Sequence, residues 1–199
     1  MAEVLVLGAG LGGLSTAMLL ARDGHQVTVL ERDPGEPPPA AEAWEAWERR
    51  GVNQFHLPHF MLPRWRVQME REVPEVLDEL AAAGGVRVHC LGMLPGSRRG
   101  PLRDGDERFE TVTARRPVLE AAVATVAGRT PGVTIRRGVA VTGLLTDPHE
   151  RAPAPHVRGG ADPGRPDPPR RPGGRLRRPA LPAGVVAGGG RRPAAGRGA

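Results

Sequence analysis

Several residue types are missing from the chain, and each absence narrows the class of protein. Its 199 residues include no lysine and no tyrosine, one isoleucine and one asparagine, and aromatic residues make up 3% of it. The single cysteine, Cys90, excludes an intramolecular disulfide and fits a reducing compartment. No apolar run approaches the roughly 20 residues that span a bilayer, and the first residues lack the pattern of a signal peptide. We therefore expect a cytoplasmic protein without a transmembrane segment.

Arginine, glycine and proline take the place of the missing types, and they are unevenly distributed. Residues 1–150 carry 17 arginines against 20 acidic residues, whereas residues 151–199 carry 11 arginines against two acidic residues. The formal net charge of +6 therefore comes entirely from the last quarter of the chain. This composition, with 28 glycines and 22 prolines, is typical of a very GC-rich gene.

A glycine-rich motif follows the first apolar run. Val4 to Leu7 is continuously apolar, which predicts a strand buried on both faces of a parallel sheet. The G-x-G-x-x-G pattern comes next: its first glycine permits a tight turn, its second lets the backbone approach a pyrophosphate, and its third permits close packing of helix on strand. The candidate cofactor-binding residues of this turn are Gly8, Gly10, Leu11, Gly12 and Gly13.

The residues after the motif support a nucleotide site. Leu14 to Arg22 predicts a helix whose N-terminus directs N–H groups and a positive dipole end at a phosphate. Gln26 to Leu30 predicts the second strand, and Glu31 stands at its end, where a carboxylate accepts hydrogen bonds from ribose hydroxyls and disfavours a 2′-phosphate. A βαβ turn without a ligand is the alternative. Strand, glycines, helix and acid in this order favour a dinucleotide.

The remainder of the first 150 residues predicts further elements of one α/β domain. A proline-rich loop covers residues 33–39. We expect helices over 40–50, over 67–83 with an interruption at Pro74, and over 118–127, and strands over 86–91, 107–114, 133–136 and 139–145, the last two joined at Arg137 and Gly138.

Two groups of polar side chains are candidates for a site of their own. The histidines His56, His59 and His89, with Cys90, do not have the spacing of a zinc module, so we predict no metal site. Arg64 offers a planar, permanently charged fork that suits phosphate or flavin oxygens, with a solvated surface arginine as the alternative.

The order of these motifs resembles the FAD-dependent oxidoreductases of the aromatic-hydroxylase type, which include flavin monooxygenases. The resemblance covers about residues 3–147. It is carried by the glycine motif with Glu31, the stretch from His59 to Arg64, the helix start Arg116-Pro117-Val118-Leu119-Glu120, and the strand pair from Val133 to Leu145.

The resemblance implies a Rossmann-like FAD-binding domain over residues 1–148, with a parallel sheet. FAD would place its pyrophosphate on the glycine turn and its adenosine ribose on Glu31. Further cofactor contacts are implied for Arg32 and the backbone at Val141 at the adenine end, and for Arg64 and Arg116 near the flavin. In such enzymes NAD(P)H reduces the flavin, which then activates oxygen; catalytic side chains are not indicated.

Residues 149–199 depart from the family, which continues with a D-x-V-V-x-A-x-G strand, a substrate-binding sheet and a Gly-Asp motif. Of residues 151–199, 41 are arginine, proline, glycine or alanine, which predicts a disordered basic tail. Read one base later, the codons of Arg170 to Arg175 are compatible with Ala-Asp-Leu-Val-Val, so our hypothesis is a frameshift near residues 150–161. We expect a truncated flavoprotein with weak or no activity.

Two other function classes stay open. One is an NAD(P)-binding reductase. The other is a non-catalytic nucleotide-binding protein whose basic tail contacts nucleic acid or membrane phosphates. Because the tail has no aromatic residue for base stacking and no amphipathic helix, we expect no specific nucleic-acid partner. The sequence indicates neither the small-molecule substrate nor the oligomeric state.

Overall fold

The computed structural model describes residues 1–49, 51–98, 100–146, 157–161 and 185–187, and a largely parallel sheet forms its base. β1 (Glu3–Leu7) pairs in parallel with β2 (Gln26–Leu30), which pairs in parallel with β6 (Val133–Arg136). β9 (Val185–Ala187) adds an antiparallel strand to the free edge of β1. α1 (Leu11–Arg22) connects β1 to β2, as in a βαβ unit. This confirms the predicted Rossmann-like α/β fold class.

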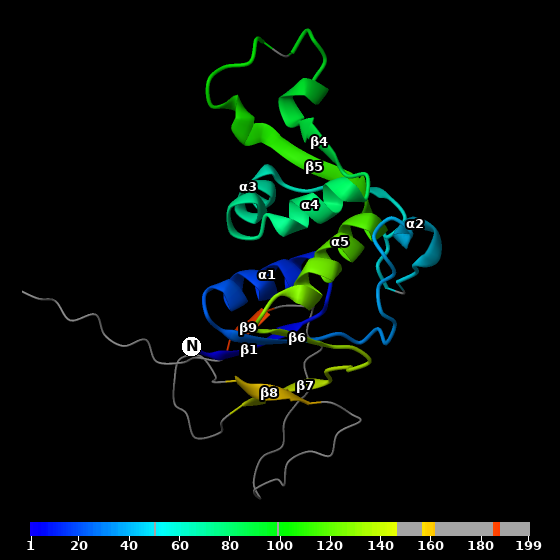
Figure 1. Cartoon of the computed structure of the whole chain (residues 1–199), viewed down its shortest axis with the longest axis vertical. Helices are drawn as coiled ribbons and strands as arrows, with labels where there is room; N and C mark the ends of the chain where they lie inside the picture. Colours follow the sequence, from blue (N-terminus) through cyan, green and yellow to red (C-terminus); the bar gives the residue numbers. More distant parts are fainter. Residues whose placement is uncertain (50, 99, 147–156, 162–184, 188–199) are drawn as a thin grey trace, which may run out of the picture.

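One face of this sheet is covered by helices (Figure 1). Val4 and Val6 of β1, and Val27 and Val29 of β2, are buried there against α1. Leu5 and Leu7, which alternate with them, are half-buried. The prediction that this strand is buried on both faces was therefore only partly correct: one face of β1 is buried, and the described residues cover the second face only in part.

The helix α5 (Arg116–Arg129) forms the centre of the core. Of the eleven residues from Pro117 to Ala127, all except Thr125 are buried, so the helix presents no wide polar face. It packs against α1, α4 (Glu75–Ala82) and β6, and the start of the helix contacts the second sheet. A helix that is apolar on nearly all sides belongs in the interior, which explains why the predicted helix over 118–127 is found there.

A second sheet lies on the far side of the helices (Figure 1). Its central strand β5 (Glu110–Arg115) pairs antiparallel with β3 (Pro58–Phe60) and β4 (Val86–His89). α3 (Pro63–Glu72) and α4 lie between this sheet and α1 with α5. The predicted interruption at Pro74 is confirmed. α3 begins four residues earlier than expected, because Pro63 occupies the first helical position, where proline is favoured.

The helix predicted over residues 40–50 is reduced to α2 (Ala43–Ala46). Trp47 leaves the helix with extended backbone angles and packs edge-on against Phe55 at 5.2 Å. Trp44 instead contacts His56 and lies under the Arg115 guanidinium. Tertiary contacts of the two indoles therefore override the helical pattern, and the tryptophans do not share one helix face.

The segment after β6 also differs from its prediction. Residues 139–142 are irregular, and β7 (Gly143–Thr146) pairs with β8 (Val157–Ala161) in a separate two-stranded sheet. The reason is a turn at Gly138, where φ is +71°, after which Val139 donates its N–H to the carbonyl of Glu31. The chain thus returns to the end of β2 instead of forming a hairpin with β6.

Shorter differences occur at two predicted strands. The strand over 86–91 ends at His89 and continues as a 3-10 turn, η1 (Cys90–Met93), and the strand over 107–114 begins only after a second turn, η2 (Asp106–Phe109). The predicted tail falls mostly outside the described residues; its described segments are β8 and β9. The domain boundary and the frameshift stay predictions. None of the described helices has the length and apolar character of a membrane-spanning segment.

Arg66 ties α3 to the second sheet. Its side chain is buried and donates to the carbonyl oxygens of Glu110 at 3.2 Å and Glu107 at 3.3 Å. It also forms an ion pair with Glu70, one helical turn away on α3. A buried guanidinium requires such partners, because an unpaired buried charge is costly.

We predict that Arg66→Ala lowers the free energy of unfolding by about 2–3 kcal/mol, because the carbonyl oxygens of Glu107 and Glu110 lose their donor and the packing of the buried Arg66 side chain is lost. Arg71→Ala, on the same helix, is the control: Arg71 is exposed and, among the described residues, forms its ion pair with Glu72, so its removal changes stability by less than about 0.5 kcal/mol. Urea unfolding measures both. Equal losses in the two variants would contradict the assignment.

Candidate dinucleotide site

The glycine turn joins the end of β1 to the start of α1. Gly8 adopts φ of +96°, in the left-handed region that favours glycine, and donates its N–H to the carbonyl of Leu30 at 2.8 Å. A Cβ on Gly13 would lie 2.0 Å from the carbonyl oxygen of Gly8 and 3.3 Å from a methyl group of Val6. The first and third glycines of the motif are thus required by the turn and by the contact between helix and strand, for the reasons predicted.

The second glycine has a different environment. Gly10 is the N-cap of α1, and a Cβ there would meet nothing nearer than Nη1 of Arg49, at 3.8 Å. Gly12 has no neighbour within 4 Å of its Cβ position. No side chain in the described part caps this helix, so its first amide N–H groups lack an intrahelical acceptor. Open space in front of free N–H groups at a helix N-terminus suits an anionic group such as a pyrophosphate.

Glu31 lies beside this turn at the end of β2, and its side chain is 4% exposed. Its Oε2 accepts the N–H of Ala9 at 2.7 Å and one N–H of Arg49 at 2.7 Å, and its Oε1 accepts the N–H of Asp33 at 3.0 Å. Each carboxylate oxygen accepts about two hydrogen bonds, so Oε1 retains capacity for a further donor. The acid is therefore fixed next to the glycine turn, with one oxygen that can accept a further hydrogen bond.

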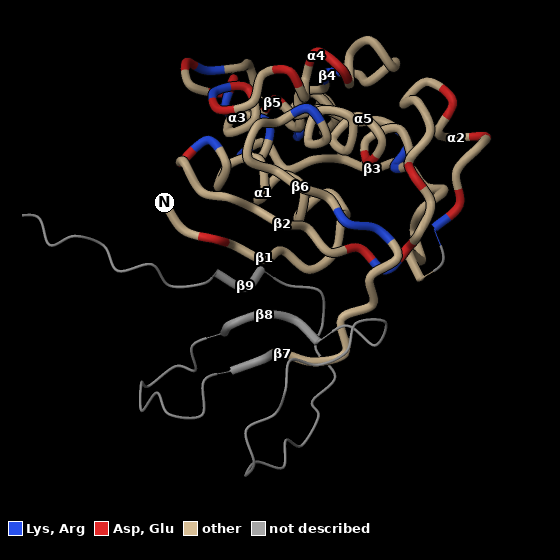
Figure 2. Tube along the Cα trace, turned by 60° about the horizontal axis from the view of Figure 1, so that its bottom comes forward, with Lys and Arg blue, Asp and Glu red and all other residues tan. Residues whose placement is uncertain are grey.

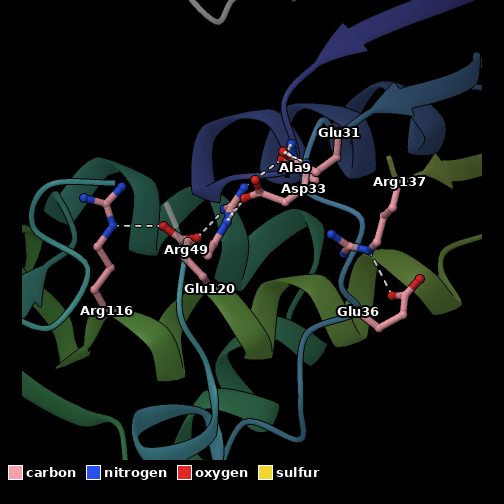
Figure 3. Close-up of polar contacts among 8 residues, drawn as sticks. All are labelled: Ala9, Glu31, Asp33, Glu36, Arg49, Arg116, Glu120 and Arg137. Atoms are coloured by element: carbon pink, nitrogen blue, oxygen red, sulfur yellow. Dashed lines mark hydrogen bonds and ion pairs between the residues drawn. The ribbon is translucent and has the colours of Figure 1, made fainter. Parts of the chain in front are cut away.

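Arg49 is the most connected side chain of the site (Figure 3). Besides Glu31, it contacts Asp33 through Nε at 3.1 Å and Glu120 through Nη1 at 2.6 Å. Burial opposes its charge, but the hydrogen bond to Glu120 and the charges of Glu120 and Glu31 outweigh that effect and raise the pKa of Arg49 above its usual value. Arg49 is a permanent cation against the second glycine of the motif.

Glu120 extends the chain of ion pairs to Arg116. Its Oε1 accepts from Nε of Arg116 at 2.9 Å, while its Oε2 takes Arg49. Figure 3 shows the resulting sequence of contacts, from Arg116 at the start of α5 through Glu120 and Arg49 to Glu31 and Ala9. We call Glu31, Asp33, Arg49, Arg116 and Glu120 the ionic chain.

His59 lies at the Arg116 end of the ionic chain. Its burial and the positive charge of Arg116 lower its pKa, and the charge of Glu120 opposes that shift. The imidazole is therefore neutral at physiological pH and adds no cation to the site.

The structure brings together some of the predicted cofactor residues. Gly8, Gly10, Leu11, Gly12 and Gly13 form one turn beside Glu31, and Arg116 is linked to Glu31 through the ionic chain. Val141 follows the segment that bonds to Glu31, but it lies in irregular structure and not in a strand. Arg32 is exposed, with its guanidinium close to Gly51. Arg64 is exposed on α3 and outside the ionic chain.

Three residues of the site, Asp33, Arg49 and Glu120, were not predicted as site residues; Asp33 was assigned to the proline-rich loop. Arg49 was assigned to a helix, and Glu120 was part of the family motif without a role. A signal for Glu120 was present, because it is the one acid within the apolar stretch 117–128. Arg49 carried no such signal, since arginines next to acids are common on surfaces.

Charged residues gather at the ends of the strands (Figure 2). Glu31, Arg32 and Asp33 alternate in charge beyond β2, and β6 ends with Arg136, which Arg137 follows, while the strands themselves carry few charges. A cavity of about 700 Å³ lies elsewhere, between the C-terminal ends of α1 and α5 and one side of α4, and is lined by side chains that include Arg22, Glu75 and Arg129. In the described ranges, no group of three or more histidine, cysteine or acidic residues is arranged to hold a metal ion.

Comparison with known families decides the relationship. The sequence model of the family described as FAD dependent oxidoreductase matches residues 3–149, about three quarters of the chain. The chain belongs to this family. The matched range contains the glycine turn, Glu31 and the whole ionic chain.

Individual relatives match over shorter lengths. Aklavinone 12-hydroxylase RdmE of Streptomyces purpurascens is 69% identical over 36 residues, which are 18% of this chain and 7% of the hydroxylase. Squalene monooxygenase of Mus musculus is 26% identical over 121 residues, 54% of this chain and 21% of that enzyme. The chain thus matches about a fifth or less of each of these two curated relatives.

A solved structure supports the fold. A PqsL variant from P. aeruginosa superposes with a TM-score of 0.52 at 20% identity, covering 80% of this chain and 40% of that one. At this identity the match describes the fold alone.

We predict that Gly13→Ala destabilises the protein by about 2–4 kcal/mol, because the added methyl group would collide with the backbone of Gly8. Gly12→Ala, one position earlier in the same helix, meets no atom and raises helix propensity, so its stability stays equal or rises by up to about 1 kcal/mol. Thermal and urea unfolding compare the two. A harmless Gly13→Ala would disprove the close packing of α1 on β1.

Proposed function

We propose that this chain is the FAD-binding part of a flavin-dependent monooxygenase. The observation that carries the proposal is the glycine turn with a buried acid beside it: an uncapped helix N-terminus, open space at Gly10, and Glu31 bonded to the N–H of Ala9. These features suit a phosphate group next to a ribose. The family relationship and the hydroxylase and monooxygenase among the relatives support the choice of FAD and of this reaction class.

Different residues of the site would bind different parts of FAD. The backbone N–H groups of Leu11, Gly12 and Gly13 would hold the pyrophosphate at the N-terminus of α1, where the helix dipole favours negative charge. Glu31 would accept a ribose hydroxyl through Oε1, the oxygen with spare capacity. Its negative charge in a buried position would disfavour a 2′-phosphate. Roles for Arg32 and Val141 near the adenine, and for Arg64 and Arg116 near the flavin, stay predictions.

Bound FAD would supply electron transfer between NAD(P)H, oxygen and a small organic substrate. The protein's own contribution in these residues is placement: the turn, Glu31 and the ionic chain bind and orient. NAD(P)H as reductant, the low activity of this chain alone and a cytoplasmic location stay predictions.

We predict that the purified chain, mixed with FAD, quenches flavin fluorescence with saturable binding. Gly10→Ala should weaken FAD binding about tenfold or more, because the methyl group occupies the space in which the phosphate approaches, while the melting temperature stays within about 2 °C of wild type. Titration calorimetry and thermal melts measure the two effects. A chain that fails to bind FAD but binds NAD would refute the proposal in favour of a reductase.

A second prediction concerns the ribose. AMP and 2′,5′-ADP differ by one 2′-phosphate, and wild-type protein should prefer AMP because the Glu31 carboxylate repels the added charge. Glu31→Gln should reduce the affinity for AMP by about tenfold, and should make the difference between the affinities for AMP and for 2′,5′-ADP smaller. Glu36→Gln is the control, since Glu36 is exposed and pairs with Arg137 away from the turn. If Glu31→Gln leaves the ratio of the two affinities unchanged, Glu31 does not contact the ribose.

A further inference from the structure

Glu120 is an unusual residue for its position. It lies in the second turn of α5, the central helix, and its side chain is 1% exposed among apolar neighbours. A carboxylate that is removed from water in this way is costly unless charged partners compensate it. The contacts within the glycine turn do not depend on Glu120, so its buried charge must have another role.

Both oxygens of Glu120 are used, and each serves a different arginine. Oε1 takes Arg116, four residues earlier on the same helix, and Oε2 takes Arg49, which is 71 residues earlier in the chain. Arg49 in turn reaches Glu31. One buried carboxylate therefore joins the residue predicted at the flavin end to the acid at the adenosine end.

The position of Arg49 depends on this carboxylate. Its loop is anchored by Trp47 and Phe55, which are both buried and pack on each other. The side chain reaches inward from that anchor, with Nη1 against Gly10 and bonded to Glu120. Asp33 and Glu31 hold the other nitrogens, so without Glu120 the nitrogen nearest the glycine turn would lose its acceptor.

We propose that Glu120 is a positioning residue of the dinucleotide site, which holds Arg49 against the glycine turn and Arg116 at the start of α5 so that the two arginines act as one unit. The residue does not touch the cofactor in this scheme; it acts through the two guanidinium groups. The proposal builds on the proposed FAD site, and it also makes a claim about Arg49 and Arg116 that is independent of any ligand.

The first test measures FAD affinity. Glu120→Gln keeps the shape but removes the charge, and should raise the dissociation constant for FAD about tenfold or more. Glu120→Asp keeps the charge on a shorter side chain and should recover part of that loss. A purely structural role would instead give losses that follow the melting temperature of each variant, without rescue by Asp, and would overturn the proposal.

Glu70→Gln is the matched control. Glu70 also bridges two arginines, Arg66 and Arg87, but it is exposed on α3 and outside the ionic chain. Its replacement should change FAD affinity less than about twofold. A loss equal to that of Glu120→Gln would show that any bridging carboxylate has the same effect, and the proposal would fail.

The second test needs no ligand and separates this inference from the proposed function. Arg49→Gln and Arg116→Gln are combined in a double-mutant cycle on the equilibrium constant of urea unfolding. In the chain that retains Glu120, the change in the unfolding constant of the double variant should differ from the product of the two single changes by at least about fivefold. In the Glu120→Gln background, that difference should fall below about twofold. Additive effects in the presence of Glu120 overturn the inference, even if FAD binds.

Failure to bind FAD, with coupling retained in the unfolding cycle, would refute the proposed function and leave the linkage between the arginines standing. If Glu120→Gln does not fold, Glu120→Asp takes its place in the cycle: the coupling between Arg49 and Arg116 should then be smaller than in the wild-type background, and an unchanged coupling overturns the inference.

Discussion

The site depends on one constraint: the carboxylate of Glu31 is buried, so the protein itself must supply the hydrogen-bond donors that water would otherwise provide. Ala9 of the glycine turn, Asp33 of the following loop and Arg49 supply those bonds. The same contacts fix the end of β2 against the turn at the end of β1. A carboxylate suited to a ribose is in this way also the group that holds the turn in shape, and the stability of the turn and its binding chemistry share one side chain.

The central helix α5 adds a second constraint, which comes from its own buried acid. α5 is apolar almost throughout and is buried against α1, α4 and β6, yet its second turn carries Glu120. Because a buried acid needs cations, Arg116 from the same helix and Arg49 from the segment after α2 must both turn inward. The hydrophobic core and the ionic chain therefore form one structure: packing places α5, and the acid on α5 places the arginines.

Features that depend on residues close together in the chain were predicted accurately, and features that depend on contacts between distant residues were not. β1, α1 and β2 were predicted well because glycine spacing, apolar periodicity and a terminal acid are local signals. The helix over 40–50 was predicted too long because Trp47 leaves it to pack on Phe55, and the strand predicted over 139–145 begins only at Gly143 because Val139 bonds to Glu31. In both cases a contact between distant residues replaced the local preference.

By itself the sequence determined the glycine turn, its helix and Glu31, because each follows from the steric and electrostatic needs of residues that lie close along the chain. The tertiary structure alone decided that Arg49 and Glu120 belong to the same site. Their contact joins residues 71 positions apart, and it exists only because α5 is buried beside the loop that carries Arg49. No local pattern encodes a distance of that kind; it arises when a buried charge finds its partner in the folded core.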